Sequence, residues 1–186
     1  MVALPQPSKF TEREYLALEA AAETKHEFVH GYIIAMAGAD LVHNLIAGNA
    51  LYELRRAIGD GPCEVVGSDQ RVKLDASRDY FYPDVTLLSE PPVLADAPPR
   101  ALTNPTAVVE VLSPSMAAYD VGTKLELYQQ LVSLTDIVFI ASDRRQVMHY
   151  QRLDAARWTN VASHDTVRFH NGLAVEVDDL YRRTEL

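Results

Sequence analysis

The chain has 186 residues, of which 48% are hydrophobic and 23% are charged. This balance is typical of a folded globular protein and excludes a disordered or fibrous chain. Its one cysteine, Cys63, excludes an internal disulfide framework and a multi-cysteine zinc site. No apolar run approaches the roughly 20 residues that cross a bilayer, and residues 1–10 lack the basic start and long apolar core of a signal peptide. We therefore expect one cytoplasmic domain over residues 1–186, with no membrane partner.

The charge balance is acidic, with 26 acidic and 17 basic residues and a formal net charge of −9. Proteins that coat nucleic acid without specificity are usually basic, so the balance counts against that class. It leaves open a local metal site that offsets the charge of a phosphate.

The first part of the chain predicts a helix, a hairpin and a long helix. Thr11 followed by Glu14 is typical of a capping box, which predicts a helix over residues 11–22. Apolar runs at 27–29 and 32–34 flank His30-Gly31 and predict a hairpin. Asp40 is placed to cap a helix over 41–58, which the Gly-rich residues 59–62 end.

The rest of the chain predicts a mixture of strands with one further helix. Strands are expected over 64–66, 70–74, 79–82, 84–88, 107–112, 136–141, 146–152 and 158–162. Five prolines within 89–105 indicate an exposed loop, and a helix is expected over 118–132. This mixture predicts an α/β or α+β fold.

Glu110 interrupts the otherwise apolar run 107–112. A continuous apolar run is typical of a strand that is covered on both faces, so Glu110 is expected to lie away from bulk water. A buried, unpaired carboxylate costs several kcal/mol, so a cationic group should lie nearby. Half of a structural salt bridge is an equally good interpretation of this residue alone.

Lys124 supplies a candidate for that cation. At 100° per residue, an apolar stripe runs along the helix predicted over 118–132 and consists of Val121, Leu125, Tyr128 and Val132. Lys124 falls within this stripe, between Leu131 and Tyr128 in projection. A lysine there either extends to solvent or points at a carboxylate across the packed interface. Because the helix follows directly on the strand of Glu110, the two side chains can meet. Taken alone, Lys124 is more often a surface residue.

Asp84 is the third ionisable group in an apolar setting. It follows Pro83, which removes a backbone donor and favours an edge or irregularity in the strand. Taken alone, such an aspartate is most often a turn or strand-end residue.

Two carboxylates and a lysine are the groups that hydrolysis of a phosphodiester requires. Magnesium prefers oxygen ligands and commonly takes one or two protein carboxylates together with waters and substrate oxygens. Such a metal neutralises the phosphate and lowers the pKa of a bound water, while a lysine stabilises developing negative charge. The sequence lacks a P-loop, a G-x-G-x-x-G motif, a G-x-S-x-G motif and zinc-ligand histidine pairs.

Pro83-Asp84 followed by Glu110-Val111-Leu112 resembles the PD-(D/E)XK nuclease signature. Further segments make the resemblance more specific: residues 27–31, 43–44, 68–72, 82–85, 109–115 and 119–120, together with Lys124. In this order and spacing they resemble the bacterial Uma-two family of restriction-endonuclease-like proteins, from about Phe10 to Tyr181. The chain departs from the signature at Leu112, where a lysine would stand.

The resemblance implies a restriction-endonuclease-like mixed sheet flanked by helices, with an αβββαβ-type core. It also implies a divalent metal, Mg²⁺ or Mn²⁺, held by Asp84 and Glu110, a DNA substrate and often a homodimer. Migration of the lysine to the next helix is familiar in this superfamily, and Lys124 fits it. The superfamily sometimes adds an acidic metal ligand near the first helix-to-strand junction, where Glu27 lies; an exposed strand residue is the alternative.

Three further residues are weaker candidates. Asp69 and Arg71 share a strand face at period 2 and could touch the site or the substrate, with a structural ion pair as the equal alternative. His43, at a helix start, could contact substrate, although a capping or surface role is more common. We therefore expect a metal-dependent endodeoxyribonuclease; the alternatives are an inactive nuclease-like binding or regulatory module, and hydrolysis of RNA or another phosphodiester.

Overall fold

The structure is a computed structural model of the chain and describes residues 9–36, 38–114 and 120–186. Its main sheet has six strands in the order β10 (Trp158–Val161), β9 (Val147–Arg152), β8 (Asp136–Ala141), β7 (Ala107–Leu112), β6 (Val85–Leu88) and β3 (Glu64–Gly67). Strands β7 and β8 are parallel and the other neighbours are antiparallel. The predicted mixed α/β fold is confirmed.

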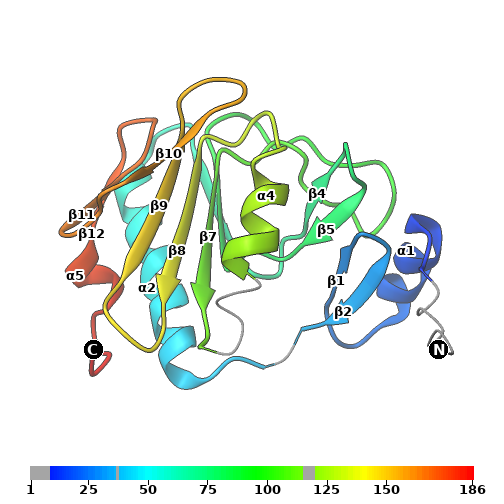
Figure 1. Ribbon diagram of the computed structural model, residues 1–186, viewed down its shortest axis with the longest axis horizontal. Helices are drawn as coiled ribbons and strands as arrows, with labels where there is room; N and C mark the ends of the chain where they lie inside the picture. The colour runs from blue at the N-terminus through cyan, green and yellow to red at the C-terminus, as the bar shows by residue number, and fades with distance from the viewer. Residues whose placement is uncertain (1–8, 37, 115–119) are drawn as a thin grey trace, which may run out of the picture.

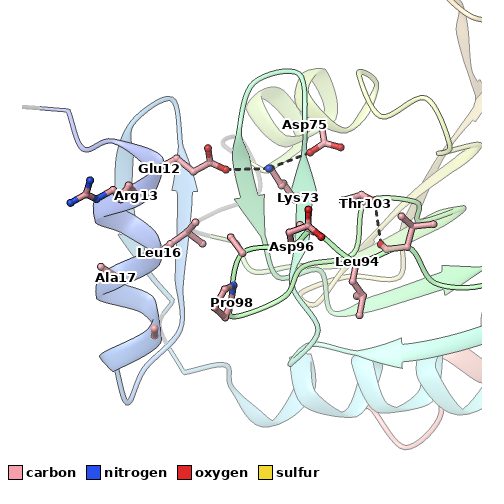
Figure 2. A pocket seen from close by; sticks show the side chains of 14 residues that line it. Glu12, Arg13, Leu16, Ala17, Lys73, Asp75, Leu94, Asp96, Pro98 and Thr103 are labelled. Carbon is pink, nitrogen blue, oxygen red and sulfur yellow. Dashed lines mark hydrogen bonds and ion pairs between the residues drawn. The ribbon is translucent and has the colours of Figure 1, made fainter.

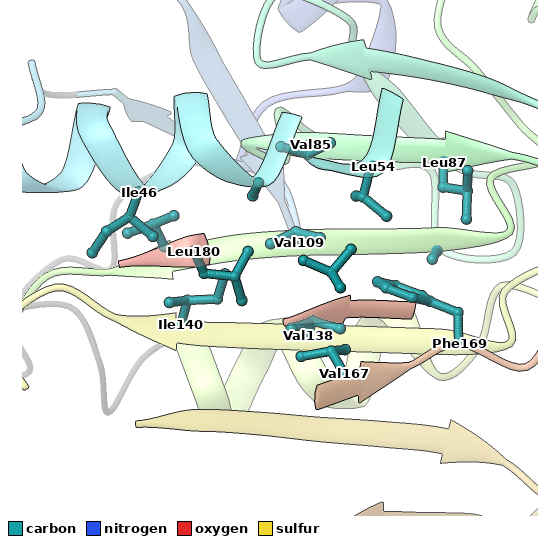
Figure 3. Close-up of a cluster of buried hydrophobic side chains, with 14 of the residues drawn as sticks. Ile46, Leu54, Val85, Leu87, Val109, Val138, Ile140, Val167, Phe169 and Leu180 are labelled. Atoms are coloured by element: carbon teal, nitrogen blue, oxygen red, sulfur yellow. The ribbon is translucent and has the colours of Figure 1, made fainter. Parts of the chain in front are cut away.

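Helices cover both faces of this sheet (Figure 1). Helix α2 (Leu41–Ile58) packs Ile46 and Leu54 against Val109 of β7, in the cluster that Figure 3 shows. On the other face, the π-helical turn η1 (Asp120–Lys124) and helix α4 (Leu125–Tyr128) pack against Val108 and other side chains. Alternate residues of β7 thus face α2 and α4, which explains its continuous apolar run. Glu110 lies on the α4 side.

A second sheet lies beside α1 (Glu12–Ala21), in the order β2 (Tyr32–Ala35), β1 (His26–Val29), β5 (Asp79–Phe81) and β4 (Val72–Leu74). Tyr15 of α1 stacks on Phe28 of β1 with ring centroids 4.8 Å apart. The β1–β2 turn has positive φ at His30 and Gly31, as a two-residue hairpin requires. This second sheet brings β1 toward the α4 side of the main sheet, because Val29 and Tyr128 belong to the same buried cluster.

Most of the predicted elements are confirmed. The capping box of Thr11 and Glu14 begins α1, and Asp40 accepts a hydrogen bond from the His43 N–H at the start of α2. Helix α2 has the predicted bounds and strands β7 and β8 begin and end where expected. None of the helices in the described ranges combines the length and apolar character that crossing a membrane requires.

The helix predicted over 118–132 is wrong at its end. Residues 118 and 119 lie outside the described part of the chain, and α4 ends at Tyr128. The following N–H groups of Gln130 and Leu131 bond to carbonyls three residues back, which tightens the chain into turns. Val132, assigned to the apolar stripe, is 90% exposed as a result.

The exposed loop predicted over 89–105 is only partly correct. Residues 90–100 are mostly exposed, but Ala101 and Leu102 are buried. The backbone of Leu102 bonds to Arg71 and Lys73, so this segment extends the second sheet beyond β4. Three C-terminal elements were not predicted, because they are too short to show a periodic pattern: the hairpin of β11 (Thr166–Arg168) and β12 (Ala174–Glu176), and helix α5 (Val177–Leu180).

A buried aspartate organises the hydrogen bonds at the start of β8. Asp136 is 1% exposed, and its Oδ1 lies 2.9 Å from both His149 Nε2 and Gln151 Nε2. The backbone N–H of His170 and the Thr135 hydroxyl also bond to this carboxylate. Burial raises the pKa of Asp136, but these hydrogen bonds outweigh it, so the pKa lies below its ordinary value. This cluster joins β8, β9 and the C-terminal hairpin.

Candidate functional site

Asp84 lies beside Glu110 because of the register between β6 and β7. Val85 pairs with Val109 at the end of this antiparallel ladder, so Asp84, the residue before Val85, comes next to Glu110, the residue after Val109. The backbone N–H of Val111 donates to Asp84 Oδ2 at 2.7 Å, and His43 Nε2 lies 3.4 Å from the same oxygen. Asp84 Oδ1 makes no hydrogen bond with any residue in the described ranges, and the side chain keeps 15% of its surface exposed.

Glu110 is buried at 5% exposure and is held through one of its two oxygens. Its Oε1 accepts hydrogen bonds from the Tyr128 hydroxyl at 2.5 Å and from Lys124 Nζ at 3.2 Å. Within the described part of the chain, no hydrogen bond reaches Oε2. Asp84 and Glu110 therefore each use one oxygen for contacts with the protein and retain one for a ligand.

Lys124 joins the two sheets at this site. It is 5% exposed, at the end of η1, and its Nζ lies 2.9 Å from Glu27 Oε1 as well as 3.2 Å from Glu110 Oε1. Of the two alternatives for Lys124, the structure shows the one in which the amine points at carboxylates rather than extending to solvent. Glu27, on β1, is 4% exposed, so its interpretation as an exposed strand residue is wrong. The Tyr82 N–H lies 3.4 Å from the same Glu27 oxygen.

Among the described residues of the site, carboxyl groups outnumber basic side chains. Burial raises the pKa of Glu110 to about 8; Lys124 opposes this shift, whereas the charges of Asp84 and Glu27 add to it. The hydrogen bond to Asp84 raises the pKa of His43 above its ordinary value, although burial opposes it. Among the described side chains, the carboxylates of Asp84, Glu110 and Glu27 share Lys124 and His43, and a bound cation would relieve the repulsion between the carboxylates.

The carboxylate oxygens that remain are the donor type that magnesium and manganese prefer. No three His, Cys, Asp or Glu side chains in residues 9–36, 38–114 and 120–186 form a group that could hold a metal ion. Magnesium commonly takes one or two carboxylates and completes its shell with waters and substrate oxygens. Asp84 and Glu110 match that donor set.

The structure does not bring Asp69 and Arg71 to this site. Strand β4 begins at Val72, and residues 68–70 form a turn, so the prediction that the two share a strand face is wrong. The Asp69 side chain is 98% exposed and pairs with Lys25. Arg71 is buried, and it donates to the Tyr15 hydroxyl and to the Pro99 carbonyl. Both residues have structural partners and touch neither of the two central carboxylates.

Sequence reasoning missed one residue of the site, Tyr128, and treated it only as part of the apolar stripe. The signal was available, because Tyr128 lies four residues after Lys124 and so on the same helix face. His43 was regarded as a weak candidate, yet it contacts Asp84 from the first turn of α2. Its Nδ1 atom is buried and has no hydrogen-bond partner among the described residues.

A separate cleft of about 760 Å³ lies between α1 and the segment 93–98 (Figure 2). Its walls include Leu16 and Leu94, and its polar end holds Lys73 between Glu12 and Asp75, at 3.2 and 3.3 Å. None of the residues predicted for the site lines this cleft. The carboxylate site and the cleft are therefore distinct features of the molecule.

The chain is similar to several known proteins over most of its length. A family model described as "Uma2: Putative restriction endonuclease" matches residues 13–178. "Uncharacterized protein sll1609" of Synechocystis sp. is 38% identical over 148 residues, which cover 80% of this chain and 84% of that protein. "Uncharacterized protein slr1290" of the same organism is 32% identical over 177 residues, which cover 94% and 92%.

A solved structure shares the fold. A crystal structure of a "putative nuclease belonging to DUF820" from Anabaena variabilis matches with a TM-score of 0.71 and 16% sequence identity. The match covers 92% of this chain and 97% of that chain. The mixed sheet flanked by helices is thus an arrangement already seen in a crystal.

Proposed function

Because the chain belongs to the Uma2 family, described as "Putative restriction endonuclease", we propose that it is a metal-dependent endonuclease that hydrolyses phosphodiester bonds in DNA. Residues 1–186 would form one nuclease-like domain. The observation that carries this proposal is the pairing of Asp84 with Glu110, each with one oxygen fixed and one available, beside the amine of Lys124.

Asp84 and Glu110 would hold Mg²⁺ or Mn²⁺. Such a cation, when bound, neutralises phosphate charge and lowers the pKa of a coordinated water. The backbone N–H of Val111 and the ring of His43 keep Asp84 in place through Oδ2. Tyr128 and Lys124 hold Glu110 through Oε1. These contacts orient both carboxylates before any ligand arrives, which is the usual role of groups around a metal ligand.

Lys124 would stabilise the negative charge that develops on the phosphate oxygens during attack. Its amine is buried between the carboxylates of Glu27 and Glu110, at 2.9 and 3.2 Å. Glu27 acts in this scheme as the group that positions Lys124, because its Oε1 lies 2.9 Å from Nζ. This assignment replaces the earlier expectation of Glu27 as an additional metal ligand.

The direct test incubates the purified protein with supercoiled and linear DNA, and with RNA, in Mg²⁺, Mn²⁺ or EDTA. We expect divalent-dependent nicking of DNA by the wild type. Asp84→Asn and Lys124→Met should each lower the rate by about a hundredfold or more. Asp69→Asn is the matched control, because it changes an exposed carboxylate outside the site. Equal nicking by wild type and Asp84→Asn would exclude Asp84 from the chemistry.

A second candidate is a nuclease-like binding or regulatory module without turnover. The observation that favours it is that Lys124 is already paired with both Glu27 and Glu110, which limits its reach toward a substrate. This module would bind Mn²⁺ and DNA but leave the DNA intact under every divalent condition. The resemblance to restriction endonucleases also implies a homodimer, which light scattering of the purified protein would test.

A further inference from the structure

Tyr128 is buried at the centre of the site, and its ring and its hydroxyl serve different neighbours. The side chain has 0% exposure, and its ring packs against Phe81 with centroids 5.2 Å apart. The hydroxyl donates to Glu110 Oε1 at 2.5 Å. A buried phenol needs a hydrogen-bond partner, but a backbone carbonyl would satisfy it as well as a carboxylate does.

Tyr181 shows what that neutral alternative looks like in the same fold. Its hydroxyl, also buried, bonds to the backbone carbonyls of Ala141 and Gln146 at 3.0 and 2.9 Å. The bond from Tyr128 to Glu110 is shorter, at 2.5 Å, and lies at the short end of the range of O–H···O hydrogen bonds. The two tyrosines therefore differ in the group that they hold, and only the contact of Tyr128 bears on a carboxylate of the site.

Lys124 and Tyr128 reach the same oxygen of Glu110 from one face of the η1–α4 segment, one helical turn apart. Two donors on Oε1 fix the rotation of the carboxylate about its last torsion. No residue in the described ranges bonds to Oε2. The orientation of Glu110 thus depends on the Tyr128 hydroxyl as well as on the Lys124 amine.

We propose that Tyr128 is a positioning residue that holds Glu110 Oε1 and so directs Oε2 toward the divalent cation. This inference rests on the proposed function, because it takes Glu110 as a metal ligand. Tyr128, which the sequence placed in the apolar stripe of the helix, thereby contributes to metal affinity. Groups that orient a metal ligand in this way typically contribute tenfold to a hundredfold to affinity.

The test is Mn²⁺ binding by Tyr128→Phe, measured by calorimetry on the full chain in the absence of DNA. Phenylalanine keeps the ring against Phe81 and removes only the hydroxyl, so we expect a folded protein whose Kd for Mn²⁺ is about tenfold to a hundredfold higher. Tyr181→Phe is the matched control: it removes another buried hydroxyl and should lower the Tm while leaving the Kd within about twofold of wild type. A purely structural role of Tyr128 would give the same result as this control.

Asp84→Asn separates this inference from the proposed function. If Asp84→Asn abolishes Mn²⁺ binding and Tyr128→Phe binds like wild type, the metal site stands and the role of Tyr128 is overturned. If the wild type binds no Mn²⁺, or Asp84→Asn binds it equally well, the proposed function and this inference both fail. A crystal structure of the wild type with Mn²⁺ gives a second test: a cation on Glu110 Oε1, or Tyr128 turned away from it, would also overturn the inference.

Discussion

Replacing Glu110 by glutamine distinguishes a metal ligand from half of a structural salt bridge. Glu110 is 5% exposed, and burial raises its pKa from an ordinary value of 4.5 to about 8. A glutamine keeps the shape of the side chain and an acceptor oxygen for the Tyr128 hydroxyl. Lys124 retains Glu27 at 2.9 Å, so the change does not leave a buried cation unpaired. In the metal-free protein, Glu110→Gln should therefore increase stability.

The magnitude follows from the pKa. Below pH 4.5 the Glu110 carboxyl is protonated in both the folded and the unfolded protein, so its raised pKa costs the folded protein nothing. As the pH rises from 4.5 toward 8, the unfolded protein loses this proton while the folded protein keeps it, and the folded protein becomes progressively less stable. Each pH unit in that window costs about 1.4 kcal/mol, so the variant should gain on the order of 3 kcal/mol relative to wild type at pH 7. Near pH 4.5 the two proteins should be equally stable.

The assay is urea unfolding with EDTA at several pH values from 4.5 to 8, repeated with saturating Mn²⁺. Glu110→Gln should gain stability with rising pH relative to wild type and lose the stabilisation by Mn²⁺. Glu53→Gln is the matched control, because Glu53 is equally buried but lies 2.6 Å from Arg56 and 3.4 Å from Arg182. The control should lose about 1–3 kcal/mol. A loss of several kcal/mol in Glu110→Gln with EDTA at pH 8 would refute the reasoning and make Glu110 a structural partner of Lys124.

Three other variants test how residues outside the site contribute to the stability of the fold around it. Arg152→Met removes a guanidinium that donates to the carbonyls of Gln129 and Leu131 just past α4, and it should lower the free energy of unfolding in urea with EDTA by about 3 kcal/mol. Asp136→Asn should lower the free energy of unfolding by about 1–3 kcal/mol at pH 7. Because the pKa of Asp136 is lowered in the folded protein, the difference in unfolding free energy between wild type and variant should shrink as the pH falls below about 4 in the same assay. Leu54→Ala, in the α2 core, should cost about 2–5 kcal/mol and leave the Kd for Mn²⁺ unchanged by calorimetry.

The sequence was sufficient to find Glu110 and Lys124 as a pair, because each breaks a local apolar pattern. Strand β7 is covered on both faces, and that alone predicts that a charge within it needs a partner. The helical period places Lys124 on the face that packs on the sheet, and the strand-to-helix connection is short. Both facts are local, so periodicity captures them. Asp84 was marked by Pro83, which ends the regular pairing just before β6.

The contacts that periodicity missed are those between the two sheets. Glu27 lies on β1 and meets Lys124 only because the second sheet packs on the α4 side, and no pattern near Glu27 encodes that arrangement. The prediction that Asp69 and Arg71 share a strand face was wrong for a related reason. Side chains alternate with period 2 only inside a strand, and the chain turns at residues 68–70 before β4 begins. Val132 was misplaced because the helix ends four residues earlier, at a turn that no glycine or proline marks.

The departure at Leu112 has a physical consequence for how this site is built. Leu112 lies two residues beyond Glu110 on the same strand face and is buried with Leu127 and Phe139 in the cluster beneath α4. An amine carried by β7 itself would be fixed by the sheet alone. An amine carried by η1 depends instead on how well the helix packs on the sheet, on the ion pair to Glu27, and on the hydrogen bonds of Arg152 at the end of α4. The position of Lys124 relative to Glu110 is therefore a property of the packing between layers, and a change that loosens this packing should disturb the site before it unfolds the sheet.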